Sequence, residues 1–424
     1  MKKRVLTLLL ASVMLVFALS ACASESPSPS SAGSGSNDNN ASDNSGNENP
    51  PAGLTSDEIT LTVWESDNGP DEFIKQAGEA FTALYPNITI KWAHVELGDA
   101  VTQIGLDGPA GIGPDLFAGP HDRIGSLVSD GHVLPVANQS KIKNAVLGAC
   151  ALGATYNGTM YGYPVAAETY AMFYNKDLIA EADVPTTWEG VIEFAKGFNA
   201  PNLYGFMMDV TSAYYTILFT TSDDNLLFGP SGTDTANTFI NSPASVKGME
   251  FFQGMREILD VAADDITTAV SDSAFTSGMT ALYITGPWNI APFINEGMNF
   301  GIAPLPSLPG QNTPASSFSG TRCMFVSAYS EYPDEAAAFA DFLVSEEMQK
   351  LRNDITGAIP SVDIPVDSPY LPGLIKQLDY AFPMPSIPEM GKYWDAMSAA
   401  CKNIWNGADI QSELDAADAA ILAG

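Results

Sequence analysis

The chain has 424 residues, enough for two or three domains, and it carries 18 basic and 50 acidic residues for a formal net charge of −32. Proteins that bind nucleic acid neutralise phosphates with Lys and Arg, so this charge excludes nucleic acid as a natural partner. The charge keeps a folded body soluble and away from anionic lipid, and a neutral partner is the easiest to reconcile with it.

The N-terminus has the pattern of an export signal. Three basic residues at 2–4 precede an apolar run over 5–19, so residues 1–21 are predicted to be a secretory signal peptide. The run is shorter than a typical membrane-spanning helix, which argues against a permanent anchor. Residues 19–22 (LSAC) resemble the lipobox of bacterial lipoproteins, which implies cleavage before Cys22 and lipid attachment to that residue.

The polar stretch that follows predicts a tether. Residues 23–57 contain no aromatic residue, no Lys and no Arg. Such a segment cannot bury enough apolar surface to offset the entropy cost of ordering, so residues 22–57 are predicted to be a lipidated cysteine and a disordered tether. The lipobox resemblance places the protein on the outer face of the cytoplasmic membrane of a Gram-positive bacterium, attached through its lipid only.

The first elements of the body predict an α/β fold. Alternating apolar residues predict a strand over 59–63, and helical spacing predicts a helix over 71–84. A strand over 88–92, a helical stretch over 99–104 and a strand over 115–118 follow. Strands that alternate with helices in this way indicate a parallel sheet.

Residues 117–125 (FAGPHDRIG) begin at the carboxyl end of the third predicted strand, where open α/β sheets bind their ligands. His121, Asp122 and Arg123 therefore stand where polar side chains could grip a ligand. The alternative is that Asp122 caps a helix through residues 124–128, with Arg123 a solvated neighbour. The residues themselves leave both interpretations open.

Later segments supply further helices and strands. Residues 186–189 (TTWE) fit a capping box, with Thr186 as N-cap and Glu189 at the third helical position. Cys150, Cys323 and Cys401 form no CxxC pair, and buried free thiols are favoured over a disulfide. No His/Cys group has metal-ligand spacing, so neither a metal nor a cofactor is expected. The remaining patterns predict helices over 245–259, 334–343, 346–353 and 392–405, and strands over 171–174, 281–284 and 324–326.

Several segments in order resemble the solute-binding proteins of ABC importers, and among them the maltose/maltodextrin-binding group. They are residues 61–64 (LTVW) with Asp67 and Asn68, 113–125 (GPDLFAGPHDRIG), 161–168 (YGYPVAAE), 174–178 (YNKDL), 185–189 (PTTWE), 285–288 (TGPW), 304–306 (PLP) and 387–394 (IPEMGKYW). The resemblance implies a two-lobed, periplasmic-binding-protein-like α/β fold with three crossings between the lobes. It implies lobe one at 58–166 plus 321–361, lobe two at 167–320 plus 362–424, and hinges near Ala167, Gly320 and Ser361.

The resemblance also implies a sugar site. Carboxylates accept hydrogen bonds from sugar hydroxyls, Arg donates to them, and aromatic rings lie flat on the apolar faces of sugar rings. Trp288 and Trp394 could instead be core residues, and Glu168 a surface acid. His121 is expected to orient its loop without touching ligand. The residues implied to hydrogen-bond sugar are Asp67, Asn68, Asp122, Arg123 and Glu168, and those implied to stack on it are Tyr214, Tyr215, Trp288 and Trp394.

The chain departs from the family pattern at some of these places. Asn68 stands where a well-known member has a lysine, and Ser212 stands where that member has a glutamate. Asp209 lies three residues before Ser212, and the sequence leaves open whether it takes the place of that glutamate. Gly119 and Asp395 replace aromatic residues. These changes leave the exact saccharide, its linkage and its length open.

The leading hypothesis is a monomeric, membrane-tethered binding protein that delivers an α-glucan of the maltodextrin type to the permease subunits of an ABC importer. The same fold could instead carry another neutral sugar, or capture glycans without a permease. The alternative from another class is a secreted glycoside hydrolase that uses two carboxylates. No GxSxG or HExxH motif supports an enzyme.

Overall fold

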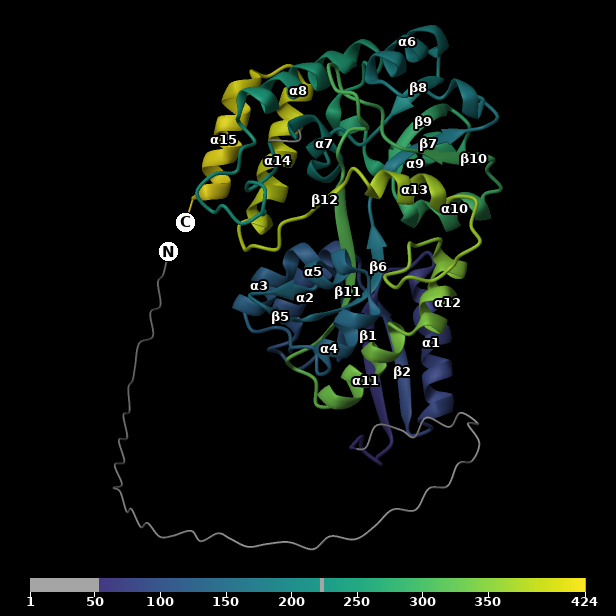
Figure 1. Ribbon diagram of the computed structural model, residues 1–424, viewed down its shortest axis with the longest axis vertical. Coiled ribbons are helices and arrows are strands. Elements are labelled where there is room, and N and C mark those ends of the chain that lie inside the picture. Colours follow the sequence, from purple (N-terminus) through teal and green to yellow (C-terminus); the bar gives the residue numbers. More distant parts are fainter. Residues whose placement is uncertain (1–52, 222–224, 424) are drawn as a thin grey trace, which may run out of the picture. The chain divides into compact units, whose positions relative to one another are not determined.

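A computed structural model describes residues 53–221 and 225–423. The predicted signal peptide, Cys22 and most of the predicted tether lie outside the described residues. The described chain is built around two separate β-sheets with helices packed on their faces (Figure 1). A small hairpin of β4 (Thr155–Tyr156) and β5 (Thr159–Met160) accompanies them.

The first sheet confirms the predicted alternation of strands and helices. Its strands β1 (Ile59–Glu65), β2 (Ile88–His94) and β3 (Leu116–Pro120) are parallel, with β1 in the middle. α1 (Pro70–Leu84) and α2 (Leu97–Asp107) connect them. The sheet as a whole is mixed, because β11 (Phe318–Val326) pairs antiparallel with β3 and with β6 (Gly162–Glu168). β12 (Phe382–Pro383) completes the order β12-β11-β3-β1-β2.

The apolar residues of these elements make the first core. Leu61 and Val63 of β1 are fully buried, and α1 buries the face that carries Phe73, Ile74 and Phe81. Burial of such side chains stabilises a fold by about 1.5–3 kcal/mol each. The other helices of this part are α3 (Ile124–Ser129), α4 (Gln139–Ala145), α5 (Gly148–Gly153), α11 (Pro333–Leu343) and α12 (Glu346–Thr356).

The second sheet has the order β10-β7-β9-β8. Its strands are β7 (Ala171–Asn175), β8 (Tyr204–Met207), β9 (Thr280–Thr285) and β10 (Phe300–Ala303). A second core of buried side chains includes Trp188, Phe206 and Trp405. The helices around it are α6 (Trp188–Phe198), α7 (Ala213–Thr220), α8 (Pro243–Gly254), α9 (Thr268–Thr276), α10 (Ile290–Asn295), α13 (Leu371–Leu378), α14 (Met390–Trp405) and α15 (Ile410–Leu422).

The chain passes between the two sheets along strands. β6 belongs to the first sheet, and only Thr169 and Tyr170 separate it from β7 of the second. Residues 304–317 lead back from β10 into β11. The first residue of β11, Phe318, belongs to the second core, while Met324 and Phe325 of the same strand belong to the first. One continuous strand therefore joins both parts of the fold.

The expected N-cap of α6 was wrong, and the helix expected over 245–259 is α8, which ends at Gly254. The N-cap of α6 is Thr187, whose Oγ1 accepts a hydrogen bond from the backbone N–H of Gly190 at 3.1 Å. Thr186, the predicted cap, instead accepts through its backbone oxygen from the N–H of Ser307. The prediction of free buried thiols is confirmed, because Cys150, Cys323 and Cys401 are all buried and unpaired.

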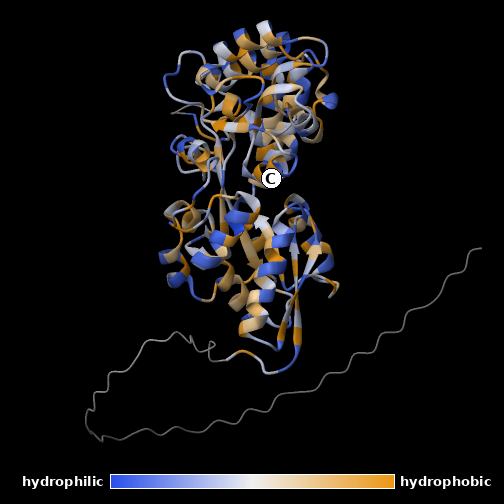
Figure 2. Cartoon of the chain, turned by 90° about the vertical axis from the view of Figure 1, so that its right-hand side faces the viewer, coloured by the Kyte–Doolittle hydropathy of each residue, from blue (hydrophilic) through white to orange (hydrophobic). Residues whose placement is uncertain are grey.

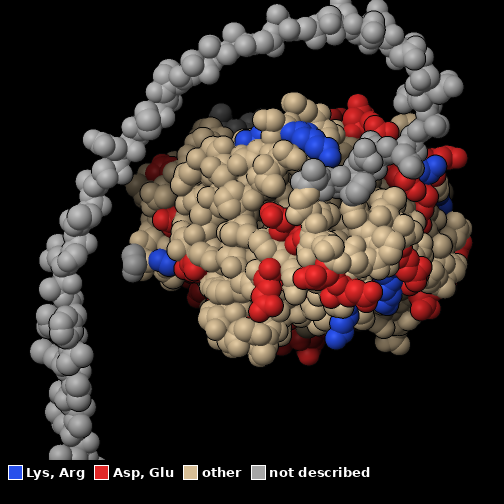
Figure 3. All heavy atoms as spheres, turned by 90° about the horizontal axis from the view of Figure 1, so that it is seen from below, with Lys and Arg blue, Asp and Glu red and all other residues tan. Residues whose placement is uncertain are grey.

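Surface properties agree with the composition. Acidic side chains cover more of the face drawn in Figure 3 than basic ones do. Hydrophobic and hydrophilic residues are interspersed along the helices (Figure 2). Among the described residues, no helix is both long enough and apolar enough to span a bilayer.

Candidate functional site

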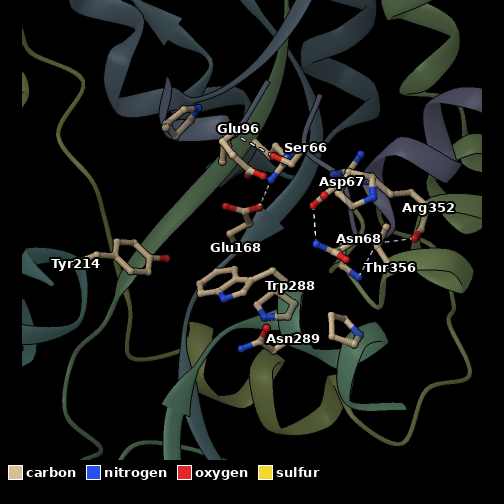
Figure 4. A pocket seen from close by; sticks show the side chains of 18 of the residues that line it. Ser66, Asp67, Asn68, Glu96, Glu168, Tyr214, Trp288, Asn289, Arg352 and Thr356 are labelled. Atoms are coloured by element: carbon tan, nitrogen blue, oxygen red, sulfur yellow. Dashed lines mark hydrogen bonds and ion pairs between the residues drawn. The ribbon is translucent and has the colours of Figure 1, made fainter. Parts of the chain in front are cut away.

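A cleft of about 580 Å³ receives side chains from elements of both sheets. Figure 4 shows part of its lining, including Asp67, Glu168 and Trp288. Segments that lie far apart in the sequence meet here. The sequence-predicted residues that line the cleft are Asp67, Asn68, Asp122, Arg123, Glu168, Tyr214, Trp288 and Trp394. Tyr215 does not line it.

Asp67 and Asn68 reach the cleft from the turn between β1 and α1. The Nδ2 of Asn68 donates to Oδ1 of Asp67 at 2.5 Å. Asn68 has a φ of 59°, a conformation that Asn tolerates better than most residues, and Gly69 follows with a φ of 124°. The turn therefore depends on this Asn-Gly pair and orients the Asp67 carboxylate.

Asp122 and Arg123 lie in the 3-10 helix His121–Arg123, directly after β3. Asp122 is buried, and its Oδ2 accepts from the indole Nε1 of Trp394 at 3.0 Å and lies 3.4 Å from Nε of Arg123. α3 has no side-chain cap, so the alternative role of Asp122 as a helix cap is wrong. Burial raises the pKa of Asp122, and Arg123 only partly opposes this effect.

His121 orients the loop that follows β3, as predicted. Its Nδ1 accepts from the backbone N–H of Thr321 at 3.0 Å, so its Nε2 carries the proton and donates to the backbone oxygen of Met384 at 3.0 Å. Burial lowers the pKa of His121, which keeps the ring neutral. The imidazole ties the loop after β3 to β11 and to the segment before α14, and it does not line the cleft.

A buried charge network underlies the cleft, and the sequence analysis missed it. Arg322 of β11 donates through Nη2 to Oε1 of Glu65, and its Nη1 lies 3.6 Å from Glu168 Oε1. Arg352 of α12 lies 3.7 Å from Glu65 Oε2. Burial alone would raise the pKa of Glu65, but the two arginines outweigh it and hold that pKa below its usual value. Glu168 is thus anchored at the floor of the cleft.

Three aromatic rings line the second-sheet side of the cleft. The ring of Tyr214 lies 6.1 Å from that of Trp288 and 6.4 Å from that of Trp394, between ring centres. Phe318 supports Tyr214 from behind at 5.9 Å. Each of the three lining rings is partly exposed. They form an apolar surface on this side of the cleft, and the Trp394 ring reaches the Asp122 carboxylate through its indole N–H.

Tyr215 is buried beneath this surface. Burial raises the pKa of its phenol, while hydrogen bonding with Thr285 and Trp288 opposes the rise. The structure places Tyr215 as a support for the Trp288 ring. Tyr170 donates to the backbone oxygen of Tyr215 at 3.3 Å, and its ring contacts the rings of Tyr214 and Tyr215 edge-on.

Asp209 and Ser212 do not line the cleft. Oδ1 of Asp209 accepts from the backbone and hydroxyl of Thr211, and Oδ2 accepts from the backbone and hydroxyl of Thr268 at the start of α9. Both oxygens are engaged, so Asp209 fixes the local backbone. Asp272 of α9 does line the cleft, and the sequence analysis did not single it out.

One group of possible metal ligands lies at the rim. Ligand atoms of Asp67, His94 and Glu96 lie within 4.8 Å of one another. His94 Nε2 and Glu96 Oε1 are 2.8 Å apart, and this bond raises the pKa of His94. Within the described part of the chain it is the only such group, and all three of its residues are exposed.

Comparison with known proteins decides the family. The model for "Bacterial extracellular solute-binding protein" matches residues 76–369, which is most of the folded chain. The chain belongs to this family. The galactooligosaccharide-binding protein of Bacillus subtilis is 31% identical to this solute-binding protein over 373 residues, which cover 84% of this chain and 87% of the relative.

Other relatives are similar over comparable lengths. A maltooligosaccharide ABC transporter solute-binding lipoprotein of Streptococcus pneumoniae is 29% identical over 364 residues, covering 81% of this chain and 84% of the relative. A cyclo/maltodextrin-binding protein complexed with maltotetraose has 32% identity and a TM-score of 0.72, over 85% of this chain and 96% of that one. A Thermus thermophilus maltotriose-binding protein bound to maltotriose has 26% identity and a TM-score of 0.79, over 85% and 99%.

These likenesses confirm the predicted two-lobed fold of the periplasmic-binding type. The number of crossings between lobes and the exact lobe boundaries stay predictions. The relatives are named as solute-binding proteins, not as enzymes.

Proposed function

We propose that this protein captures a maltodextrin-type α-glucan and delivers it to the permease of an ABC importer, without cleaving it. The observation that carries the proposal is the meeting of Tyr214, Trp288 and Trp394 with Asp67, Asp122 and Glu168 in one cleft. A site for neutral sugar rings needs aromatic rings and carboxylates together. The rings cover the apolar C–H faces, and the carboxylates accept from the hydroxyls.

Each predicted contact has a role in this proposal. Tyr214, Trp288 and Trp394 stack on sugar rings, with Tyr215 supporting Trp288. Arg123 donates to hydroxyls next to Asp122, which shares its Oδ2 with Trp394. The sugar hydrogen-bonding residues are Asp67, Asn68, Asp122, Arg123 and Glu168.

The proposal includes movement of the lobes. Lobe one comprises 58–166 plus 321–361, lobe two comprises 167–320 plus 362–424, and hinges near Ala167, Gly320 and Ser361 close them on ligand. The short β6–β7 connection supports the crossing near Ala167, and the passage of β11 through both cores supports the crossing near Gly320. The permease then recognises the closed, liganded form. The protein acts as a monomer and is attached to the outer face of the membrane through a lipid on Cys22.

Calorimetric titration of the purified protein with maltose, maltotriose and maltotetraose tests the proposal. We expect saturable binding to the α-glucan series, no cleavage products on chromatography, and no heat with sucrose or xylobiose. Heat from a control sugar alone would keep the transport role and discard the maltodextrin cargo. Release of shorter glucans would revive the hydrolase alternative.

A galactooligosaccharide is a second candidate cargo. It is favoured by the 31% identity to the galactooligosaccharide-binding protein of Bacillus subtilis. The aromatic surface suits either sugar, since both present apolar ring faces. Galactotriose titrated alongside maltotriose discriminates them, and the tighter ligand identifies the cargo.

A further inference from the structure

Asp272 reaches the cleft from α9, on the second-sheet side. Its Oδ1 accepts two hydrogen bonds, from the hydroxyl of Tyr283 at 2.8 Å and from Nδ2 of Asn289 at 2.5 Å. None of the described residues donates to Oδ2 of Asp272. The carboxylate is therefore held rigidly through one oxygen while the other stays available in a residue that lines the cleft.

Asn289 is oriented by the same arrangement. Its Nδ2 also donates to Oγ1 of Thr285 at 2.9 Å, so the amide nitrogen makes both hydrogen bonds of this side chain. This leaves Oδ1 of Asn289 as an acceptor without a donor among the described residues. Asn289 is buried, lines the cleft, and directly follows Trp288 in the sequence.

A purely structural role does not explain a carboxylate at position 272. An asparagine could accept the bonds from Tyr283 and Asn289 through its oxygen without the cost of a buried charge. Burial raises the pKa of Asp272, which shows that the ionised form is penalised here. What the carboxylate adds over an amide is a second acceptor oxygen.

The rest of the cleft shows why such an acceptor is needed. Asp67, Asp122 and Glu168 all come from elements of the first sheet. On the other side, Ser212 does not line the cleft and both oxygens of Asp209 are engaged. Among the described lining residues, Asp272 is the acid contributed by the second-sheet elements.

We propose that Asp272 and Asn289 form an acceptor pair that binds two hydroxyl groups of a sugar ring stacked on Trp288. The inference rests on the proposed capture of oligosaccharide and adds a subsite to it. Asp272 and Asn289 contact each other, and the acceptor that each leaves without a donor from the described chain requires a donor from the ligand. The subsite therefore selects a ring with free neighbouring hydroxyls and rejects a ring whose hydroxyls there are replaced or methylated.

Isothermal titration of Asp272→Asn with maltotriose and maltotetraose tests the acceptor pair. The substitution keeps one oxygen for Tyr283 and turns the free acceptor into a donor. We expect Kd to rise about 10-fold, the size of one lost hydrogen bond to a charged group, with little change in Tm. Asp209→Asn is the matched control, and it should lower Tm while leaving Kd unchanged.

Two further variants separate binding from structure. Tyr283→Phe removes a bond to Oδ1 only, so it should lower Tm and change Kd less than about 3-fold. If Asp272 were merely structural, Tyr283→Phe and Asp272→Asn would shift Kd and Tm in parallel, which would overturn the proposal. Asn289→Ala should also raise Kd about 10-fold, and it decides the question if Asp272→Asn does not fold.

The unmodified protein is titrated first, so that failure of the acceptor pair can be distinguished from failure of the proposed transport function. Binding by the unmodified protein with an unchanged Kd for folded Asp272→Asn overturns the acceptor pair and leaves the transport function standing. Absence of binding to any maltooligosaccharide or galactooligosaccharide overturns the proposed function, and the acceptor pair falls with it.

Discussion

Asp122 contacts two other residues of the proposed sugar site, Trp394 and Arg123. It is buried, it accepts from Trp394 at 3.0 Å, and it lies beside Arg123. A single carboxylate thus fixes a stacking ring and a donor while keeping lone pairs for ligand. This arrangement makes the position sensitive to small changes.

Replacing Asp122 with Ala should weaken α-glucan binding by about 1.5 kcal/mol or more, the value of a hydrogen bond to a charged group. The loss should show as a raised Kd in calorimetry with the folded fraction unchanged. Asp130→Ala, an exposed acid at the end of α3, is the control and should bind normally. Equal affinity of the two variants would remove Asp122 from the site.

Ligand binding should weaken on acidification at a higher pH than an ordinary aspartate would cause. Burial raises the pKa of Asp122, and the ionised form is the better acceptor. Affinity is therefore full above the raised pKa and falls as the pH drops through it. This fall begins at a higher pH than it would for an aspartate with the ordinary pKa of about 3.9. Titrations between pH 7 and 4 should show a larger loss of affinity in the unmodified protein than in Asp122→Asn, in which Asp272, whose pKa burial also raises, would still titrate. Parallel profiles would assign the step to another acid.

Sequence could identify Asp122 and Arg123 because a recognisable segment carries them at a strand end. It could not identify Asp272, which is one acid among 50 and lies inside a helix without a motif. It also missed the pairing of Glu65 with Arg322, since 257 positions separate them. Contacts between distant segments depend on how the elements pack, which no local pattern records.

At the scale of elements, α6 shows how a helix start is fixed by one side chain. Thr187→Ala removes the hydroxyl that caps the N–H of Gly190. We expect a loss of about 1 kcal/mol in the free energy of unfolding, measured in urea, with ligand affinity unchanged. Thr186→Ala, one residue earlier, should cost much less. The opposite order would restore Thr186 as the cap.

Some elements with a clear period were predicted, but α13 and α15, which each bury one face, were missed. α1 buries one face and exposes the other, which is the pattern that identifies a helix. α7 is buried almost all round, so its sequence AYYTILFT has no amphipathic period. The edge strands β8 and β10 have four residues each, too few for an alternating pattern.

At the scale of the whole molecule, the buried charge network joins elements that are far apart in the sequence: β1, β6, β11 and α12, through Glu65, Glu168, Arg322 and Arg352. Arg322→Met should lower the free energy of unfolding by about 3 kcal/mol, because Glu65 would lose its nearest buried partner. Chemical denaturation measures this loss. Arg256→Met removes an exposed pair with Asp260 and a long hydrogen bond, 3.4 Å, from Nη1 to the backbone oxygen of Trp405, and it should cost less than about 1 kcal/mol.

Closure around ligand should be visible in solution. If the lobes rotate about hinges near Ala167, Gly320 and Ser361, saturation with maltotetraose should reduce the radius of gyration in small-angle X-ray scattering. Trp394→Ala, which removes a stacking ring, should show no reduction at the same ligand concentration. An unchanged radius for the saturated unmodified protein would contradict hinge closure.

The three buried thiols have a practical consequence. Burial raises the pKa of Cys150 to about 11 and that of Cys401 to about 12, and it raises the pKa of Cys323 well above its usual value. Alkylating reagents attack the thiolate, so the folded protein should be inert to them. Each thiol becomes reactive only when its surroundings open. The protein therefore carries native reporters in both cores, and the rate of alkylation at each cysteine measures how often that core opens.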